Sequence, residues 1–252
     1  MNRFPISPRP TTSEPENRRP IAALFRRTAE GAVELCRRRG IHPNSVSSLS
    51  VVASAGAAAA LAAAGHPVLG PWWGKLLILA AVALGAFRLW LNMLDGMVAL
   101  GTGKTSPWGE VMNELPDRIS DVLIFTGLAA SGLCRPGLAL WAAIASLLIA
   151  YVGTLGQAVG AGRLFGGWMS KPWRMVAVGA GLLLALPAGD LPPLLAAFGF
   201  TGGPSFLDLA LLSILGGAGQ TLWVRLRALH GNLTAPKPAP IAFHRRYPRA
   251  AA

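Results

Sequence analysis

The sequence predicts an all-α polytopic membrane protein with six transmembrane helices, preceded by an N-terminal amphipathic juxtamembrane helix. Three observations lead to this fold class. Apolar residues make up 52% of the chain and charged residues only 13%, and the mean hydropathy is +0.46, which is a membrane-protein composition. The apolar residues gather in runs long enough to span a bilayer. Lys and Arg concentrate at the two ends of the chain and in alternate connections between the runs.

The chain begins with a polar segment and a basic helical segment. Residues 1–20 contain no apolar run, so we predict a disordered tail and not a signal peptide. Residues 21–40 have apolar side chains at helical spacing, bordered by arginines, and we predict an amphipathic helix lying on an anionic membrane surface. The alternative is a solvated basic segment that only sets the topology.

Six apolar segments follow the break at His42-Pro43. The first is rich in Ala, Ser and Gly, a composition that allows close helix packing in lipid. The predicted spans are residues 45–64, 75–99, 109–131, 137–160, 173–188 and 205–227. We therefore divide the chain into the tail 1–20, the interfacial helix 21–40, a six-helix membrane domain 41–230 and a basic cytoplasmic tail 231–252.

The positions of Lys and Arg predict the orientation. Nine Arg precede the first span and six Lys or Arg lie from Arg225 to the end, so we expect both termini in the cytoplasm and a multi-pass protein of the inner (cell) membrane. A net charge of +12 would suggest nucleic acid as the partner of a soluble protein, but this placement follows the positive-inside pattern, and we expect no nucleic-acid partner.

The connection between the second and third spans, with the helix ends beside it, carries five of the eleven acidic residues. Carboxylates at membrane depth are costly, so a cluster of them indicates a role with a cation or a proton. Asn113, Asp117 and Asp121 follow at intervals of four and share one helix face, and Asn92 and Asp95 lie on the preceding helix. Two helices that present oxygen ligands to each other predict a site for a hard divalent cation.

This spacing resembles the motif of the CDP-alcohol phosphatidyltransferase family, Asp-x-x-Asp-Gly-x-x-Ala-Arg followed by a spacer of eight residues and Gly-x-x-x-Asp-x-x-x-Asp. The matching positions are, in order, Asn92, Asp95, Gly96, Ala99, Leu100, Gly109, Asn113 and Asp117. Two acidic positions keep Asp, two are Asn, and Leu100 stands where the family has Arg. We interpret the chain as a member of a divergent bacterial subfamily.

The resemblance implies transfer of a phosphatidyl or similar phosphoalcohol group from a CDP-linked donor to an acceptor alcohol, with release of CMP, in phospholipid biosynthesis. It implies Mg²⁺ or Mn²⁺ as cofactor and Asp117 as the base that accepts the acceptor's proton. The expected metal ligands are Asn92, Asp95, Asn113 and Asp117. The expected donor-binding positions, where a nucleotide can lie against bare backbone, are Gly96, Ala99 and Gly109. Membrane lipids and a second copy of the chain are the other expected partners.

Further charged residues have two interpretations each. Arg163, Lys171 and Arg174 belong to a Gly-rich basic segment and predict a phosphate or acceptor site, or else only follow the positive-inside rule. Glu114 and Asp121 compensate for the charge missing at the Asn positions, or else form capping or interhelical contacts.

Two other function classes remain open from the sequence. Intramembrane carboxylates also occur in transporters, although we find neither inverted repeats nor paired broken helices. The Asn substitutions would equally suit a family member that has lost catalysis and serves as a lipid-binding or assembly subunit.

Overall fold

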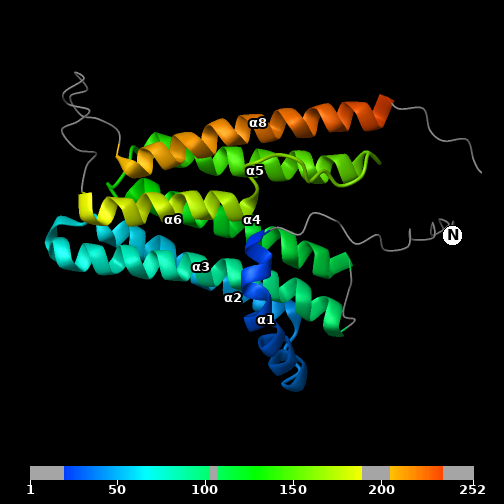
Figure 1. Ribbon diagram of the computed structural model, residues 1–252, viewed down its shortest axis with the longest axis horizontal. Helices are drawn as coiled ribbons and strands as arrows, with labels where there is room; N and C mark the ends of the chain where they lie inside the picture. Colours follow the sequence, from blue (N-terminus) through cyan, green and yellow to red (C-terminus); the bar gives the residue numbers. More distant parts are fainter. Residues whose placement is uncertain (1–19, 103–106, 189–204, 235–252) are drawn as a thin grey trace, which may run out of the picture.

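The computed structural model describes residues 20–102, 107–188 and 205–234, and in these ranges the regular structure is entirely helical. Within them, six long helices run along the long axis of the molecule, and α1 (Pro20–Arg38) crosses them (Figure 1). The long helices are α2 (Pro43–Ala64), α3 (Gly70–Thr102), α4 (Pro107–Ala130), α5 (Pro136–Ala158), α6 (Lys171–Ala188) and α8 (Phe206–Thr234). A short 3-10 helix, η1 (Pro67–Leu69), joins α2 to α3. The all-α prediction is confirmed.

The helix boundaries agree with the predicted ones to within a few residues, with two exceptions. α3 begins at Gly70 and not at residue 75, because Pro71 in the first turn needs no backbone hydrogen bond there. α8 continues to Thr234 and not only to residue 227, and the Thr234 hydroxyl donates to the His230 carbonyl at 2.8 Å in its last turn.

The six long helices form a closed ring. Going around it, the neighbours are α2, α4, α5, α8, α6 and α3, and α3 packs against α2 again. α2 packs closely against both α3 and α4, whereas α3 and α4 touch each other at only a few points. The space between α3, α4 and α6 is therefore filled by side chains that reach inward from all three helices.

Small residues allow α2 and α4 to approach closely. A Cβ atom added to Gly127 of α4 would lie 2.6 Å from the Cα atom of Ala58 in α2, so only glycine fits there. Beside this contact an apolar core extends through the ring and includes Leu61, Phe125 and Leu207.

α1 buries one side and exposes the other over its second half. Ala29 and Cys36 are buried, and the helix packs against α3. Arg37 and Arg38 are exposed and contact Glu34 at 2.7 and 2.8 Å, and their hydrogen bonds lower the pKa of Glu34 to about 2. The described apolar face is turned to the bundle, and the placement of α1 on a membrane surface stays a prediction.

The described helices identify a membrane protein. Four segments in the described ranges are long and apolar enough to cross a bilayer, namely Pro43–Ala64, Pro67–Ala99, Pro136–Ala158 and Phe206–Thr234. α4 and α6 are outside this group, since α4 carries several carboxylates and α6 begins with Lys171 and contains Arg174. Six spans therefore stay a prediction.

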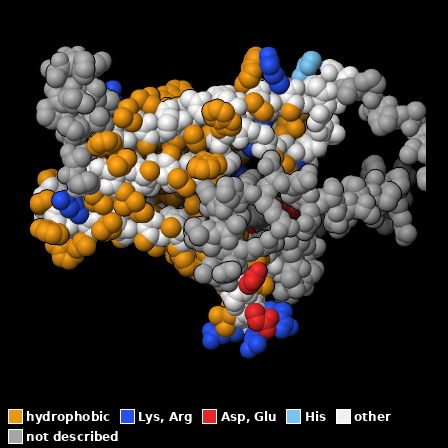
Figure 2. All heavy atoms as spheres, in the orientation of Figure 1, with side chains coloured by type: hydrophobic (Ala, Val, Ile, Leu, Met, Phe, Trp, Pro, Cys, Tyr) orange, Lys and Arg blue, Asp and Glu red, His pale blue; other side chains and the backbone are white. Residues whose placement is uncertain are grey.

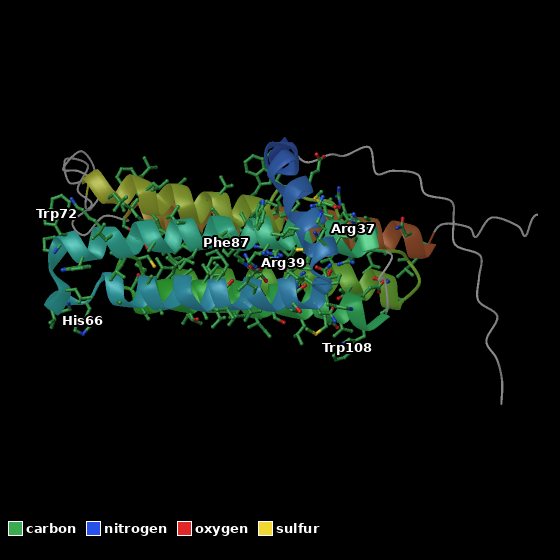
Figure 3. All side chains as sticks on the ribbon, turned by 90° about the horizontal axis from the view of Figure 1, so that it is seen from below. Arg37, Arg39, His66, Trp72, Phe87 and Trp108 are labelled. Atoms are coloured by element: carbon green, nitrogen blue, oxygen red, sulfur yellow. The ribbon has the colours of Figure 1, made fainter. Side chains whose placement is uncertain are left out.

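The surface agrees with a bundle whose ends meet water. Figure 3 places His66 and Trp72 at one end of the bundle and Trp108 at the other. Both tryptophans are well exposed, as expected for aromatic side chains at membrane interfaces. In Figure 2, hydrophobic side chains cover much of the left of the molecule, while the charged side chains of α1 gather at the bottom.

Candidate active site between α3, α4 and α6

Asp95 lies near the end of α3 and is buried. One of its oxygens accepts a 2.7 Å hydrogen bond from the Ser47 hydroxyl of α2. Within the described part of the chain its other oxygen, Oδ1, has no hydrogen-bond partner. Asn92, one turn earlier, is half-buried, and its Nδ2 atom also has no partner among the described residues. Asp95 is thus anchored through one oxygen and free to bind through the other.

Three carboxylates of α4 each pair with a cation from the α5–α6 loop (residues 159–170) or from α6. In order along α4, the pairs are Glu114–Arg163, Asp117–Lys171 and Asp121–Arg174. The exposed fraction of the carboxylate side chain falls along this series from 26% to 15% to 1%. The first two pairs are therefore accessible to a ligand, while the third is sealed inside the ring.

Arg88 of α3 joins the sealed pair. Its Nη2 atom donates to Asp121 Oδ1 at 2.7 Å and to the backbone oxygen of Asp117 at 3.2 Å. Arg174 donates to the other oxygen of Asp121 at 2.8 Å and to the Met169 carbonyl at 3.1 Å. The structure thus pairs Arg88 with Asp121 and leaves Asp95, on the same helix as Arg88, to the Ser47 hydroxyl.

A cavity of about 160 Å³ opens beside Asp117. Its charged lining consists of Glu114, Asp117, Arg118, Arg163, Lys171, Arg174 and Arg225. Cations outnumber carboxylates in this lining, which favours a ligand that carries phosphate. Asp95 is not part of the lining, but Arg88, two turns earlier on α3, donates to the backbone oxygen of Asp117 at 3.2 Å. The structure therefore brings the α3 and α4 parts of the motif to one place.

The remaining motif positions lie on the same two helices. Gly96 is exposed, and a Cβ atom added there would meet nothing within 4 Å, so this backbone is open to a ligand. Ala99 and Gly109 are half-buried, and Asn113 is exposed one turn before Asp117. Glu114 is shared between Arg163 and Arg118, the latter at 2.6 Å.

The side chains at the motif positions suit a hard divalent cation, although two of the four expected ligands are uncharged Asn. Among the described residues, no three His, Cys, Asp or Glu side chains gather as a cation site. The motif supplies the carboxylates of Asp95 and Asp117 and the amides of Asn92 and Asn113, which are all oxygen donors. Oxygen donors suit Mg²⁺ and Mn²⁺, and fewer carboxylates mean weaker binding.

Known proteins resemble this chain over most of its length. It is 30% identical over 226 residues to the phosphatidylinositol phosphate synthase of Mycolicibacterium smegmatis, covering 86% of this chain and 90% of that protein. The chain belongs to the CDP-alcohol phosphatidyltransferase family. It is also 34% identical over 103 residues to an archaetidylinositol phosphate synthase of Pyrococcus horikoshii, covering 40% and 53% of the two chains. No protein-family model matches the chain.

A solved structure shares the fold of this phosphatidyltransferase. The crystal structure of Mycobacterium tuberculosis phosphatidylinositol phosphate synthase with CDP-DAG bound has a TM-score of 0.65 and 22% sequence identity. The match covers 84% of this chain and all of the other. The family predicted from the motif is thus confirmed, and the protein is a transferase of phospholipid biosynthesis that acts on a CDP-linked donor and releases CMP. A transporter function is no longer needed to explain the intramembrane carboxylates.

Sequence reasoning missed the part that α8 has in building the phosphatidyltransferase site. Three of its side chains hold the backbone of the α5–α6 loop through hydrogen bonds of 3.0–3.1 Å. They are Gln220 to the Trp168 N–H, Thr221 to the Met169 N–H and Arg225 to the Gly166 carbonyl. The signal was present, because polar side chains within an apolar span face the bundle interior.

Asp208 is a buried acidic residue that lies outside the candidate site. It accepts from the Ser205 N–H at 3.1 Å, and its own N–H donates to the Ser205 hydroxyl at 3.0 Å. This reciprocal pair forms a capping box at the start of α8.

Proposed function

We propose that this phosphatidyltransferase uses CDP-DAG as donor and a phosphorylated alcohol, such as inositol phosphate, as acceptor. The observation that carries this proposal is the cavity beside Asp117, where five cations face two carboxylates. A phosphate on the acceptor gives those cations a partner of opposite charge. The names of the phosphatidylinositol phosphate synthases among the relatives, and the CDP-DAG complex of the structural neighbour, support the same substrates.

In this proposal Asp117 is the catalytic base. The acceptor hydroxyl oxygen forms a bond to the donor phosphorus, the bond between that phosphorus and CMP breaks, and CMP leaves with the electron pair. The hydroxyl proton passes to the Asp117 carboxylate, which the Lys171 ammonium holds at the cavity wall. Arg163 and Lys171 bind the acceptor phosphate at the open side, and Arg174 contributes its charge from the cavity floor.

A divalent cation completes the proposed site. The carboxylates of Asp95 and Asp117 and the amide oxygens of Asn92 and Asn113 would hold Mg²⁺ or Mn²⁺, which neutralises pyrophosphate charge when bound. The free Oδ1 atom of Asp95 supports this assignment. A structure of the Mycobacterium tuberculosis enzyme in complex with manganese and citrate points to the same cofactor class.

The donor nucleotide is proposed to lie over the exposed backbone at Gly96, with Ala99 and Gly109 beside it. Neither Glu114 nor Asp121 is assigned as a metal ligand here. Glu114 is shared between two arginines, and Asp121 is held on both oxygens by Arg88 and Arg174.

We propose the topology from the charge distribution and the helix lengths. α4 and α6 complete six spans with α2, α3, α5 and α8, because the ring places both of them between apolar helices. Both termini then lie in the cytoplasm at the inner membrane, with α1 at the membrane surface, the tail 1–20 before it and the basic tail 231–252 after the membrane domain. We also propose that the protein works as a homodimer.

Acceptor identity is tested by CMP release from purified protein with CDP-DAG and a divalent cation. The acceptors are inositol phosphate, free inositol and glycerol phosphate, each with wild type and with Arg163→Gln. We expect turnover with a phosphorylated acceptor, and a raised KM for that acceptor alone in the variant. Equal use of free inositol by both proteins would contradict a phosphate-binding cavity.

A further inference from the structure

The interior of the ring contains an ion cluster of three side chains from three helices. Arg88 of α3, Asp121 of α4 and Arg174 of α6 are 0%, 0% and 1% exposed. Each arginine donates to a different oxygen of Asp121, at 2.7 and 2.8 Å. α3 and α4 touch each other little elsewhere, so this three-helix ion cluster is a direct connection across the interior.

The three-helix ion cluster is linked to the pair Asp117–Lys171. Arg174 lines the cavity beside Asp117, whereas Arg88 and Asp121 do not. The Nη2 atom of Arg88 reaches the backbone oxygen of Asp117 at 3.2 Å. Arg174 lies one turn after Lys171 on α6 and also bonds the Met169 carbonyl just before that helix. One connected set of hydrogen bonds therefore reaches both the backbone of the base and the helix start that carries its cationic partner.

Pairing with Asp121 does not explain why Arg88 is there. Asp121 and Arg174 alone would form a neutral buried pair, and Arg88 adds a second guanidinium to the same carboxylate. The Nε and Nη1 atoms of Arg88 are buried and have no hydrogen-bond partner among the described residues. Unsatisfied buried donors are costly, so a position that keeps them indicates a role beyond stability. The Arg88 guanidinium bonds the backbone oxygen of Asp117, where a pyrophosphate and a carboxylate have to be brought together.

We infer that Arg88 is a positioning residue for the transfer reaction. Through the three-helix ion cluster it fixes the backbone of Asp117 and the start of α6, so that Asp117 and Lys171 meet the substrates in one geometry. Its charge acts on the site from below, without substrate contact. The inference rests on the proposed role of Asp117 as base.

Three variants separate positioning from stability. Arg88→Gln leaves Asp121 and Arg174 as a neutral pair, and Asp121→Asn leaves two arginines without a counter-ion. The double variant Arg88→Gln/Asp121→Asn leaves only Arg174 charged and so has the net charge of the wild-type cluster. Each is purified in detergent and compared by its unfolding temperature, by kcat for CMP release and by KM for donor and acceptor. Asp208→Asn, which changes a buried carboxylate away from the site, is the stability control.

We expect Arg88→Gln to unfold near the wild-type temperature but to lose about 10–100-fold in kcat, the usual effect of removing a partner that orients a site residue. KM should change by about twofold or less, because no substrate contact is lost. Asp121→Asn should unfold at the lowest temperature of the three. The double variant should regain the unfolding temperature without regaining kcat, and Asp208→Asn should lose stability at constant kcat.

Wild-type kcat in Arg88→Gln, or recovery of kcat together with stability in the double variant, would reduce the cluster to a structural role and overturn the inference. Asp117→Asn is assayed in parallel. If it keeps wild-type turnover, the proposed role of Asp117 is wrong and the inference falls with it. If it is inactive while Arg88→Gln is normal, only the inference fails.

Discussion

Gly167 in the α5–α6 loop offers a test of how the loop is held against α8. Its φ angle is +106°, and a Cβ atom there would lie 2.6 Å from both the Cβ and the hydroxyl oxygen of Thr221. The same Thr221 hydroxyl accepts the Met169 N–H at 3.0 Å, and Gln220 accepts the Trp168 N–H at 3.1 Å. Gly167→Ala must therefore push the loop away from α8 and break these two hydrogen bonds.

The magnitude follows from two terms. A side chain at positive φ costs about 1–2 kcal/mol. Two lost hydrogen bonds add about 1 kcal/mol each, so the loop position is destabilised by about 3–4 kcal/mol in total. Gly162→Ala is the matched control, because Gly162 has φ +83° but nothing within 4 Å of an added Cβ atom. This variant should therefore lose only the ~1–2 kcal/mol that a side chain at positive φ costs, about half of the total above. The difference of about 2 kcal/mol between the two variants corresponds to a factor of about 30 in an equilibrium constant.

The assay is CMP release with the acceptor varied, together with the unfolding temperature in detergent. Gly167→Ala should have about 30-fold lower kcat/KM for the acceptor than Gly162→Ala, because Arg163 and Lys171 flank the displaced segment. Equal kcat/KM in the two variants would show that α8 does not position the loop for acceptor binding.

Two further predictions concern the ligands of the site. Arg163→Ala should raise KM for a phosphorylated acceptor about tenfold while changing kcat less, because it loses a charge-assisted contact of about 1.5–3 kcal/mol that solvent partly replaces; a loss confined to kcat would argue against phosphate binding there. Asn92→Asp combined with Asn113→Asp should lower the Mg²⁺ concentration needed for half-maximal CMP release, because added ligand charge strengthens divalent binding. An unchanged Mg²⁺ titration would show that neither residue contacts the cation.

Local sequence signals predicted the helices and the family well. Pro43, Pro107 and Pro136 each stand in the first turn of a helix, where proline is favoured, and apolar runs define the helix bodies. The Ser205–Asp208 capping box joins two residues only three positions apart. These features depend on residues within a few positions of one another, so the sequence is sufficient to find them.

Pairings across the ring were not predictable in the same way. Asp117 meets Lys171 and Asp121 meets Arg174 because the order of the helices in the ring turns α4 and α6 toward the same interior, which no local pattern encodes. Arg88 shares a helix face with Asn92, four residues later, but its partner could not be read from the sequence. The ring position of α3 decides that it meets Asp121.

The central claim is that Asp95 and Asp117 form a catalytic phosphatidyltransferase site in spite of the Asn residues beside them. The most direct measurement is CMP release by purified protein with CDP-DAG, inositol phosphate and Mg²⁺ or Mn²⁺, for wild type, Asp95→Ala and Asp117→Ala. The account predicts turnover by the wild type that is lost on removing the divalent cation, and no turnover by either variant although each inserts and unfolds cooperatively. CMP release at the wild-type rate by Asp95→Ala or Asp117→Ala would contradict it.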